Sequence, residues 1–137
     1  MTTINMQTMR YINLLNRVSN VKTTKCFVYN NVIIFAVPAS LLSRTIGPNG
    51  KNVREIQNRL GKRVKIVREA NGIGDAERFV EDIVEPIAFV SFEVRGNEIV
   101  ITAGTRNKAA LIGRNKRRLI ELSRIIGDNF GKELKIV

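Results

Sequence analysis

Residues 45–67 read TIGPNGKNVREIQNRLGKRVKIV. Gly47 and Gly50 enclose Pro48 and Asn49, and Lys51 follows directly. Glycines leave a turn without side chains, so a ligand can approach the backbone closely. The helical pattern that follows would point its first N–H groups and its dipole at an anion. The stretch indicates a nucleotide-phosphate loop, a clamp on a nucleic-acid backbone, or an ordinary turn between two helices.

The composition predicts a folded protein of one ordinary domain or two small ones. The chain has 137 residues, of which 44% are hydrophobic, enough to form a packed core. It contains no apolar run long enough to span a membrane and no secretory signal at its start. The single cysteine, Cys26, lies in an apolar run, so we expect a small buried hydrophobe in a cytoplasmic protein.

The missing histidine excludes several kinds of chemistry. With no histidine and one cysteine, neither a usual zinc site nor a Ser–His or Cys–His nucleophile pair can form. The remaining catalytic candidates are the carboxylates of Asp75, Glu77, Glu81 and Asp82, whose spacing suits a solvated helix face. We therefore predict a binding protein rather than an enzyme, without metal or cofactor.

Positive charge is concentrated in the first half of the chain. Residues 1–70 hold 12 Lys and Arg against the two acids Glu55 and Glu69, and the whole chain carries +11. Such a charge predicts a polyanionic partner, although a solvated basic surface is the alternative.

The sequence repeats itself with a shift of 66 residues. TIGPNGKNVREIQNRLG at 45–61 falls on LIGRNKRRLIELSRIIG at 111–127, whereas KRVKIV at 62–67 meets KELKIV at 132–137 with a shift of 70. The four extra residues lengthen either the last helix or the following loop of the second copy. Two similar domains are predicted, at 1–70 and 71–137.

Each copy reads as helix, hairpin, short helix, glycine turn, helix and strand, an α+β fold. In the first copy, apolar residues at every third position from 6 to 18 predict one packed helix face, and Asn30-Asn31 predicts a hairpin. Pro38 and Gly47 bound the short helix, and the next helix covers 51–60. In the second copy, Asp75 is the expected N-cap of the first helix, with a hairpin around 96–97 and helices over 106–112 and 117–130.

The spacing of the turn rejects a nucleotide loop and favours a backbone clamp. A Walker A loop needs four residues between its glycines and then Lys-Ser/Thr, but only two intervene here and Asn52 follows Lys51. KH modules instead use a GXXG loop that clamps four backbone nucleotides. Ile46 and Val64 are candidates for an apolar floor under the bases, with burial in the core as the alternative for either. The predicted RNA-binding residues are Ile46, Gly47, Pro48, Asn49, Gly50, Lys51, Asn52 and Arg54 in the first copy, and Gly113, Arg114, Asn115, Lys116 and Arg117 in the second.

The second turn departs from the GXXG pattern, because Lys116 stands where the second glycine would be. Its Cβ would hold an RNA backbone further away, although its charge could still reach a phosphate. This copy is therefore either a second, more cationic RNA contact or mainly a structural support.

Over residues 25–137 the chain resembles the archaeal NusA-like transcription factors. IGPNGKNVREIQNRLGKRVKIV is similar to their first KH domain, and AALIGRNKRRLIELSRIIG resembles their second. The resemblance implies two tandem type II KH domains, each a small mixed three-stranded sheet packed on helices. It also implies a monomer that binds single-stranded RNA in transcription elongation, termination or antitermination and contacts RNA polymerase or the elongation complex. An RNA-binding protein of the ribosome or its assembly is the alternative, and single-stranded DNA is a further ligand of such grooves.

Overall fold

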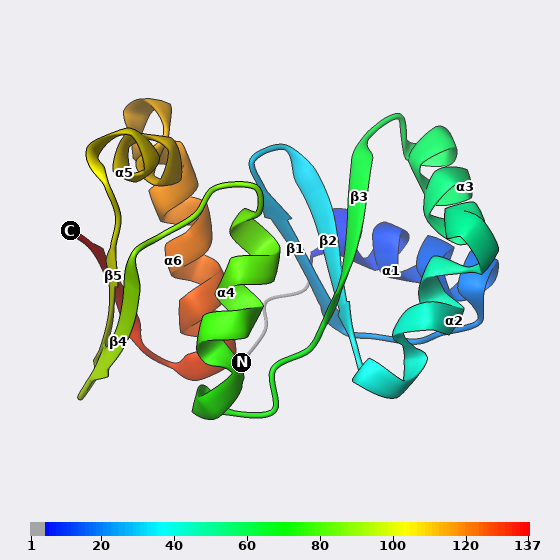
Figure 1. Ribbon diagram of the computed structural model, residues 1–137. Coiled ribbons are helices and arrows are strands. Elements are labelled where there is room, and N and C mark those ends of the chain that lie inside the picture. Colours follow the sequence, from blue (N-terminus) through cyan, green and yellow to red (C-terminus); the bar gives the residue numbers. More distant parts are fainter. Residues whose placement is uncertain (1–4) are drawn as a thin grey trace. The chain divides into compact units, whose positions relative to one another are not determined.

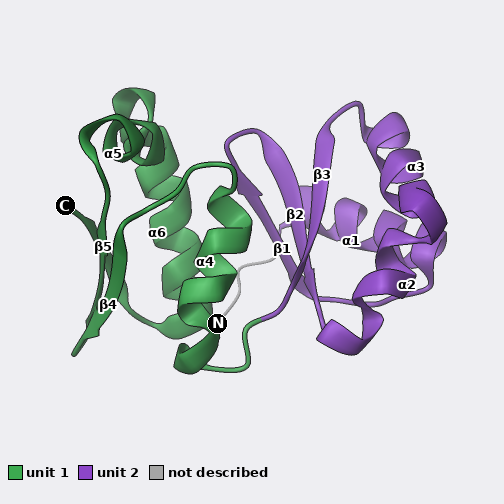
Figure 2. Ribbon diagram, viewed as in Figure 1, with its two compact units in different colours: residues 1, 70–137 green, residues 2–69 purple. Residues whose placement is uncertain are grey.

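The computed structural model describes residues 5–137, which divide into two compact units (Figure 2). The N-terminal unit (purple) ends at Glu69, and the C-terminal unit (green) begins at Ala70. Both contain the same succession of helix, two strands, two helices and strand (Figure 1). The α+β class and the duplicated element order predicted from the sequence are therefore confirmed.

The N-terminal unit packs helices on a three-stranded sheet of order β1-β2-β3. Strands β1 and β2 are antiparallel, and β2 and β3 are parallel, so the sheet is mixed. The parallel pair requires a crossover, which α2, the glycine turn and α3 provide. Its elements are α1 (Met6–Ser19), β1 (Lys25–Tyr29), β2 (Val32–Val37), α2 (Leu42–Ile46), α3 (Lys51–Leu60) and β3 (Arg63–Arg68).

The core of this unit lies between α1, α3 and the sheet. Ile33, Phe35 and Val37 alternate along β2 and pack in one cluster with Leu15 of α1 and Ile56 of α3. The predicted apolar face of α3 is confirmed, because Val53 and Leu60 pack against the same cluster.

The predicted packed face of α1 was wrong at its start. Met6 and Met9 are 76% and 52% exposed, whereas Tyr11, Leu15 and Ser19 are buried. A step of three residues falls about 60° short of a full turn of an α-helix, so a series at every third position winds off the buried face. The buried residues are instead four apart.

The local turn signals were read correctly. Asn30 and Asn31 adopt positive φ angles of 52° and 64° between β1 and β2, as a type I′ hairpin turn requires. Gly61 ends α3 in the left-handed conformation, and its N–H donates to the carbonyl of Gln57.

The C-terminal unit repeats this topology with the order β4-β5-β6. The parallel pairing of Ile33 with Val64 in the first sheet is matched by that of Ile99 with Leu134 in the second. Its elements are α4 (Ala76–Val84), β4 (Ser91–Arg95), β5 (Glu98–Thr102), α5 (Thr105–Ile112), α6 (Arg117–Phe130) and β6 (Glu133–Ile136).

The four extra residues of the second copy lie in its last helix. Helix α6 has 14 residues where α3 has 10, and it ends at Gly131 rather than Gly127. Gly131 has a φ of 63° and is therefore the structural counterpart of Gly61. With a constant shift of 66 residues, the sequence alignment had paired Gly61 with Gly127, which lies inside the longer helix α6.

Asp75 occupies the predicted N-cap position of α4 but does not cap it with its side chain. Its carboxylate Oδ2 instead accepts the backbone N–H of Asn71 at 2.9 Å. The predicted N-cap position is therefore confirmed, although the carboxylate turns back to the preceding loop.

We expect Cys26 to be unreactive in the folded protein. Its side chain is 6% exposed, and this burial raises the pKa of the thiol to about 12. Because only the unfolded chain would lose the thiol proton at moderately alkaline pH, stability falls as the pH rises above the ordinary thiol pKa of about 8.5. Titration with a disulfide reagent at pH 8 should detect one thiol in guanidinium and almost none in buffer; rapid reaction in buffer would contradict this burial.

Candidate nucleic-acid interface

A tight turn joins α2 to α3 and holds the GPNG sequence. Gly47, Asn49 and Gly50 have φ angles of 81°, 55° and 73°, so three of its four residues need conformations with positive φ. The Gly50 N–H donates to the Gly47 carbonyl at 3.1 Å, and the Lys51 N–H donates to the carbonyl of Pro48. The turn is thus a rigid, internally bonded joint.

Because of these bonds, not every backbone N–H at the turn and at the start of α3 is free for a ligand, contrary to what the sequence had suggested. Pro48 has no N–H, and the amides of Gly50 and Lys51 are occupied within the turn. No side chain caps the first turn of α3. Further donors for a ligand lie in that first turn of α3, where the helix dipole also favours an anion.

The predicted contact residues of the first copy divide into two groups. Pro48, Asn49, Lys51 and Arg54 are exposed. The other four are partly buried and form the joint itself: Ile46, Gly47, Gly50 and Asn52.

The two glycines of the turn have different steric environments. A Cβ atom on Gly47 would lie 2.8 Å from Cγ and 3.0 Å from the backbone nitrogen of Asn52. A Cβ on Gly50 would meet only the end of the flexible Arg54 side chain, at 3.4 Å. Gly47 is therefore required by the crossing of the two helices, whereas the chain itself requires Gly50 only for its φ angle.

Asn52 braces this crossing. Its Nδ2 donates to the carbonyl oxygen of Arg44 in α2 at 3.1 Å. In the second copy, the equivalent residue Arg118 donates through Nη1 to the carbonyl of Ala110 at 2.8 Å. Sequence reasoning treated Asn52 as an RNA contact and missed this bracing role, because no local pattern marks a hydrogen bond to a residue eight positions away.

Arg54 folds back onto the turn. Its Nη1 donates to the carbonyl of Asn49, so its guanidinium lies beside Gly50. The equivalent residue of the second copy is Ile120, which is exposed and offers no charge. The cation at this position is specific to the first copy.

The second turn has the same backbone conformation with different side chains. Gly113, Asn115 and Lys116 have φ angles of 74°, 55° and 60°. A Cβ on Gly113 would lie 2.9 Å from Arg118 Cγ, which reproduces the crowding at Gly47. Lys116 thus accepts the left-handed conformation that Gly50 adopts. The predicted residues Arg114, Asn115, Lys116 and Arg117 are all exposed.

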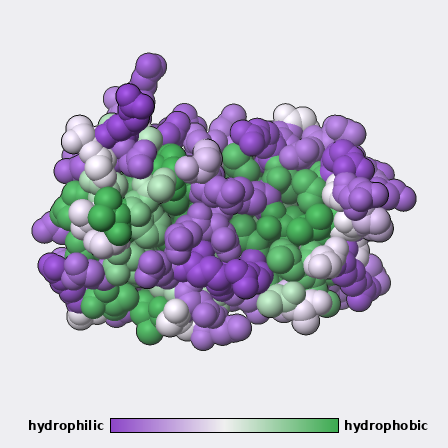
Figure 3. Space-filling view, in the orientation of Figure 1, coloured by the Kyte–Doolittle hydropathy of each residue, from purple (hydrophilic) through white to green (hydrophobic). Residues whose placement is uncertain are grey.

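An apolar floor lies beside the first turn, but its composition differs from the expectation. Val64 is 7% exposed and belongs to the core, so its proposed contact with bases was wrong. The partly exposed apolar residues are instead Leu42 of α2, Val53 of α3 and Ile66 of β3, together with Ile46. Figure 3 shows hydrophobic surface in the region where Figure 1 places β3 beside α2 and α3.

Two of the four carboxylates considered as catalytic candidates are paired with one arginine. The carboxylates of Asp75 and Asp82 pair with Arg78, at 3.9 and 3.2 Å. Among residues 5–137, no group of histidine, cysteine and carboxylate side chains could hold a metal ion. Within the same residues, no helix is long and apolar enough to cross a membrane.

Comparison with known proteins matches residues 32–81 to the KH domain family, a stretch that includes β2, the GPNG turn and β3. The chain is also 28% identical over 101 residues to the "Probable transcription termination protein NusA" of Halococcus morrhuae, covering 74% of this chain and 70% of that protein. The crystal structure of APE1850 is similar over 98% of this chain and all of its own, with a TM-score of 0.66 and 26% identity.

The fold, the turn and the family match place a KH domain at residues 32–81, and KH modules as a class bind RNA. Over 74% of its length, the chain is similar to a protein named NusA.

The unequal crowding of the two glycines predicts unequal effects on stability. Gly50→Ala should cost about 1–2 kcal/mol of unfolding free energy, the price of a side chain in the left-handed region. Gly47→Ala should cost about 1–3 kcal/mol more, because the added methyl group pushes α3 away from α2.

Urea denaturation followed by circular dichroism measures both free energies. Lys116→Gly is the matched control in the second turn and should be stabilising, since it relieves the same backbone strain. Equal losses for Gly47→Ala and Gly50→Ala would contradict the close crossing at Gly47.

Proposed function

We propose that this protein binds single-stranded RNA in the cytoplasm during transcription elongation, termination or antitermination. Its two RNA-binding domains are residues 1–70 and 71–137, and the GPNG turn clamps the RNA backbone. The observation that carries the proposal is the position of Gly50. Almost nothing in the chain crowds this residue, and the second copy tolerates lysine at the same place. Close approach of a ligand backbone accounts for a glycine there.

The first turn binds RNA by shape and charge together. The exposed Pro48-Asn49 pair and the bare Gly50 let a sugar-phosphate chain lie against the joint. Lys51 supplies a positive charge one residue later, and the uncapped start of α3 adds N–H donors. Arg54 holds the turn through Asn49 and faces the same ligand.

The bases are held on the apolar floor beside the turn. Leu42, Val53 and Ile66 are partly exposed there, and unstacked bases gain free energy by covering such surface. Recognition is by shape and apolar contact rather than by aromatic stacking, because aromatic residues make up 6% of the chain.

The second turn contacts RNA through side chains instead of bare backbone. Arg114, Lys116 and Arg117 are exposed around a joint of the same conformation. Arginine can bind a phosphate with two parallel hydrogen bonds, and lysine acts as a point charge. The second turn therefore lengthens the surface that binds RNA, and its binding depends less on close approach of the RNA backbone.

The transcriptional role rests on similarity to the protein named NusA. We infer RNA polymerase or the elongation complex as the partner, with the protein acting as a monomer. A tagged copy should co-purify with RNA polymerase from cells. Loss of the polymerase after ribonuclease treatment would mean that RNA mediates the association, and its retention would mean direct contact. Co-sedimentation with small ribosomal subunits and no recovery of polymerase would instead assign it to the ribosome or its assembly.

Replacing both exposed residues of the first turn tests the clamp. Pro48→Asp with Asn49→Asp should reduce RNA affinity by at least about a hundredfold, because two carboxylates repel the phosphates at the closest point of approach. Unfolding should be little changed, since both side chains are exposed. Fluorescence anisotropy with labelled RNA measures the affinity.

The control carries the same two added charges elsewhere. Ala88 and Val90 are exposed and lie outside both turns, so Ala88→Asp with Val90→Asp gives an equal net charge. This control should lose little affinity at physiological salt. RNA binding by the Pro48/Asn49 variant at the level of this control would refute the clamp.

A further inference from the structure

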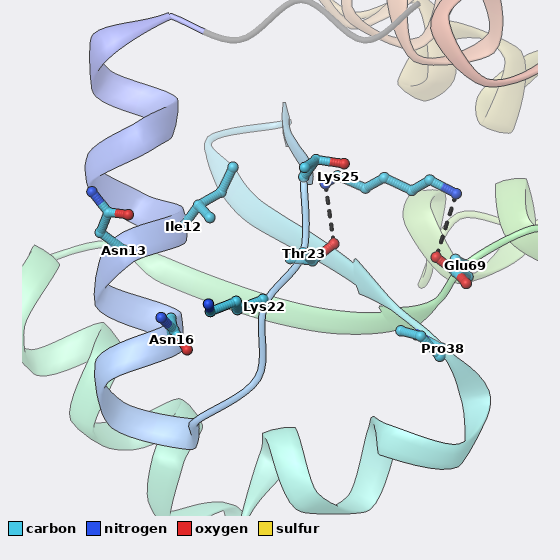
Figure 4. A pocket seen from close by; sticks show the side chains of 9 residues that line it. Ile12, Asn13, Asn16, Lys22, Thr23, Lys25, Pro38 and Glu69 are labelled. Atoms are coloured by element: carbon cyan, nitrogen blue, oxygen red, sulfur yellow. Dashed lines mark hydrogen bonds and ion pairs between the residues drawn. The ribbon is translucent and has the colours of Figure 1, made fainter.

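A cavity of about 610 Å³ lies in the N-terminal unit (Figure 4). Its walls come from the second half of α1, the segment leading into β1, and the ends of β2 and β3. None of the thirteen predicted RNA-binding residues lines it. Its volume is in the range of about 300–1,000 Å³ that small-molecule sites occupy.

One wall of the cavity is fixed by bonds within the protein. The ammonium group of Lys25 pairs with the Glu69 carboxylate at 3.4 Å, and the Thr23 hydroxyl donates to the carbonyl of Ala36 at 2.7 Å. The only carboxylate on the lining is therefore neutralised, which makes the cavity unsuitable for a metal cation.

The opposite wall presents polar side chains that the protein leaves unused. Asn13 and Asn16 lie three residues apart on α1, so both side chains are on the same side of the helix. Among the described residues, neither amide side chain has a hydrogen-bond partner, and Lys22 has no ion-pair partner. Lys22 and Asn16 both line the cavity (Figure 4). The two side-chain amides can both donate and accept hydrogen bonds, and Lys22 adds a positive charge. This combination suits a ligand in which a planar polar group is attached to an anion.

The cavity also has an apolar part. Ile12 of α1 and Pro38 after β2 line it, and they offer apolar contact surface to the faces of a ring. Amide side chains bind the edges of bases in single-stranded RNA, and apolar side chains cover their faces.

We propose that this cavity binds one nucleotide of the RNA strand, outside the four nucleotides clamped at the GPNG turn. The base lies between Ile12 and Pro38, its edge bonds to Asn13 and Asn16, and Lys22 binds a phosphate. This inference rests on the proposed RNA-binding function and extends it to a sequence-reading site. Between Pro38 and Gly47 lie only the short 3-10 turn Ala39–Leu41 and the five residues of α2, about 6 and about 8 Å along their axes, so one strand can serve both sites.

Two RNA lengths separate the cavity from the turn. A tetranucleotide fills the turn alone, whereas a dodecanucleotide of the same core sequence can also reach the cavity. The variants are Lys22→Gln and the pair Asn13→Ala with Asn16→Ala. Arg17→Gln is the matched control, because Arg17 is exposed on α1, carries the same charge and does not line the cavity.

Both cavity variants should weaken binding of the dodecanucleotide about five- to tenfold and leave the tetranucleotide unchanged. Lys22→Gln should also reduce the slope of log affinity against log salt by about 0.7, the value for one phosphate on a single strand. Arg17→Gln should change neither quantity. The amide variants should fold normally, because alanine favours the helix.

The outcomes distinguish the two proposals. If the cavity variants bind the dodecanucleotide like the wild type, the cavity proposal is overturned while the clamp stands. If the Pro48/Asn49 variant keeps its RNA affinity and the cavity variants lose theirs, the clamp is wrong and the cavity is the nucleotide site.

Nuclear magnetic resonance identifies the source of the nucleotide. The side-chain amide signals of Asn13 and Asn16 should shift on addition of the dodecanucleotide and much less with the four nucleoside monophosphates at the same concentration. Equal shifts with a free monophosphate would overturn the assignment to RNA and indicate a free nucleotide. An absence of shifts with every ligand would overturn the site altogether.

Discussion

The close crossing of α2 and α3 at Gly47 is the constraint on which the proposed interface depends. A Cβ atom there would collide with Asn52, and the Asn52 side chain in turn bonds to α2 through the Arg44 carbonyl. The crossing aims the start of α3 and fixes the positive φ angles of the residues between the helices. Without it, the exposed Pro48-Asn49 pair would have no fixed direction, and a flexible loop would lose conformational entropy on binding.

The duplication lets the two turns be compared within one molecule. Backbone conformation, the crowded first glycine and the brace to the preceding helix are common to both. The two turns differ in the residues that follow the first glycine: the partly buried Gly50 and the exposed Arg54 of the first turn correspond to the exposed Lys116 and Ile120 of the second. The shared features serve the joint, and the differing ones determine how each turn would meet a phosphate, by close approach in one case and by charged side chains in the other.

The sequence predicted best where a single residue decides the local conformation. Helix α3 covers the residues expected, because Gly50 precedes its first residue and Gly61 ends it, both in the left-handed conformation. The Asn30-Asn31 hairpin follows from the same kind of preference. Predictions failed where packing decides: Met9 is exposed at the start of α1, and Val64 is buried in the core rather than exposed to a ligand.

The sequence by itself determined the α+β class, the duplicated element order and the identity of the GPNG turn, because glycine and asparagine carry their backbone preferences wherever they stand. Only the tertiary structure decided which glycine the protein needs for its own packing, since a Cβ clash depends on atoms brought together by folding. It also decided that Asn52 braces the joint, and it brought Asn13, Lys22 and Pro38 to one cavity. Contacts of this kind join elements that are distant in the sequence, and no local sequence pattern indicates them.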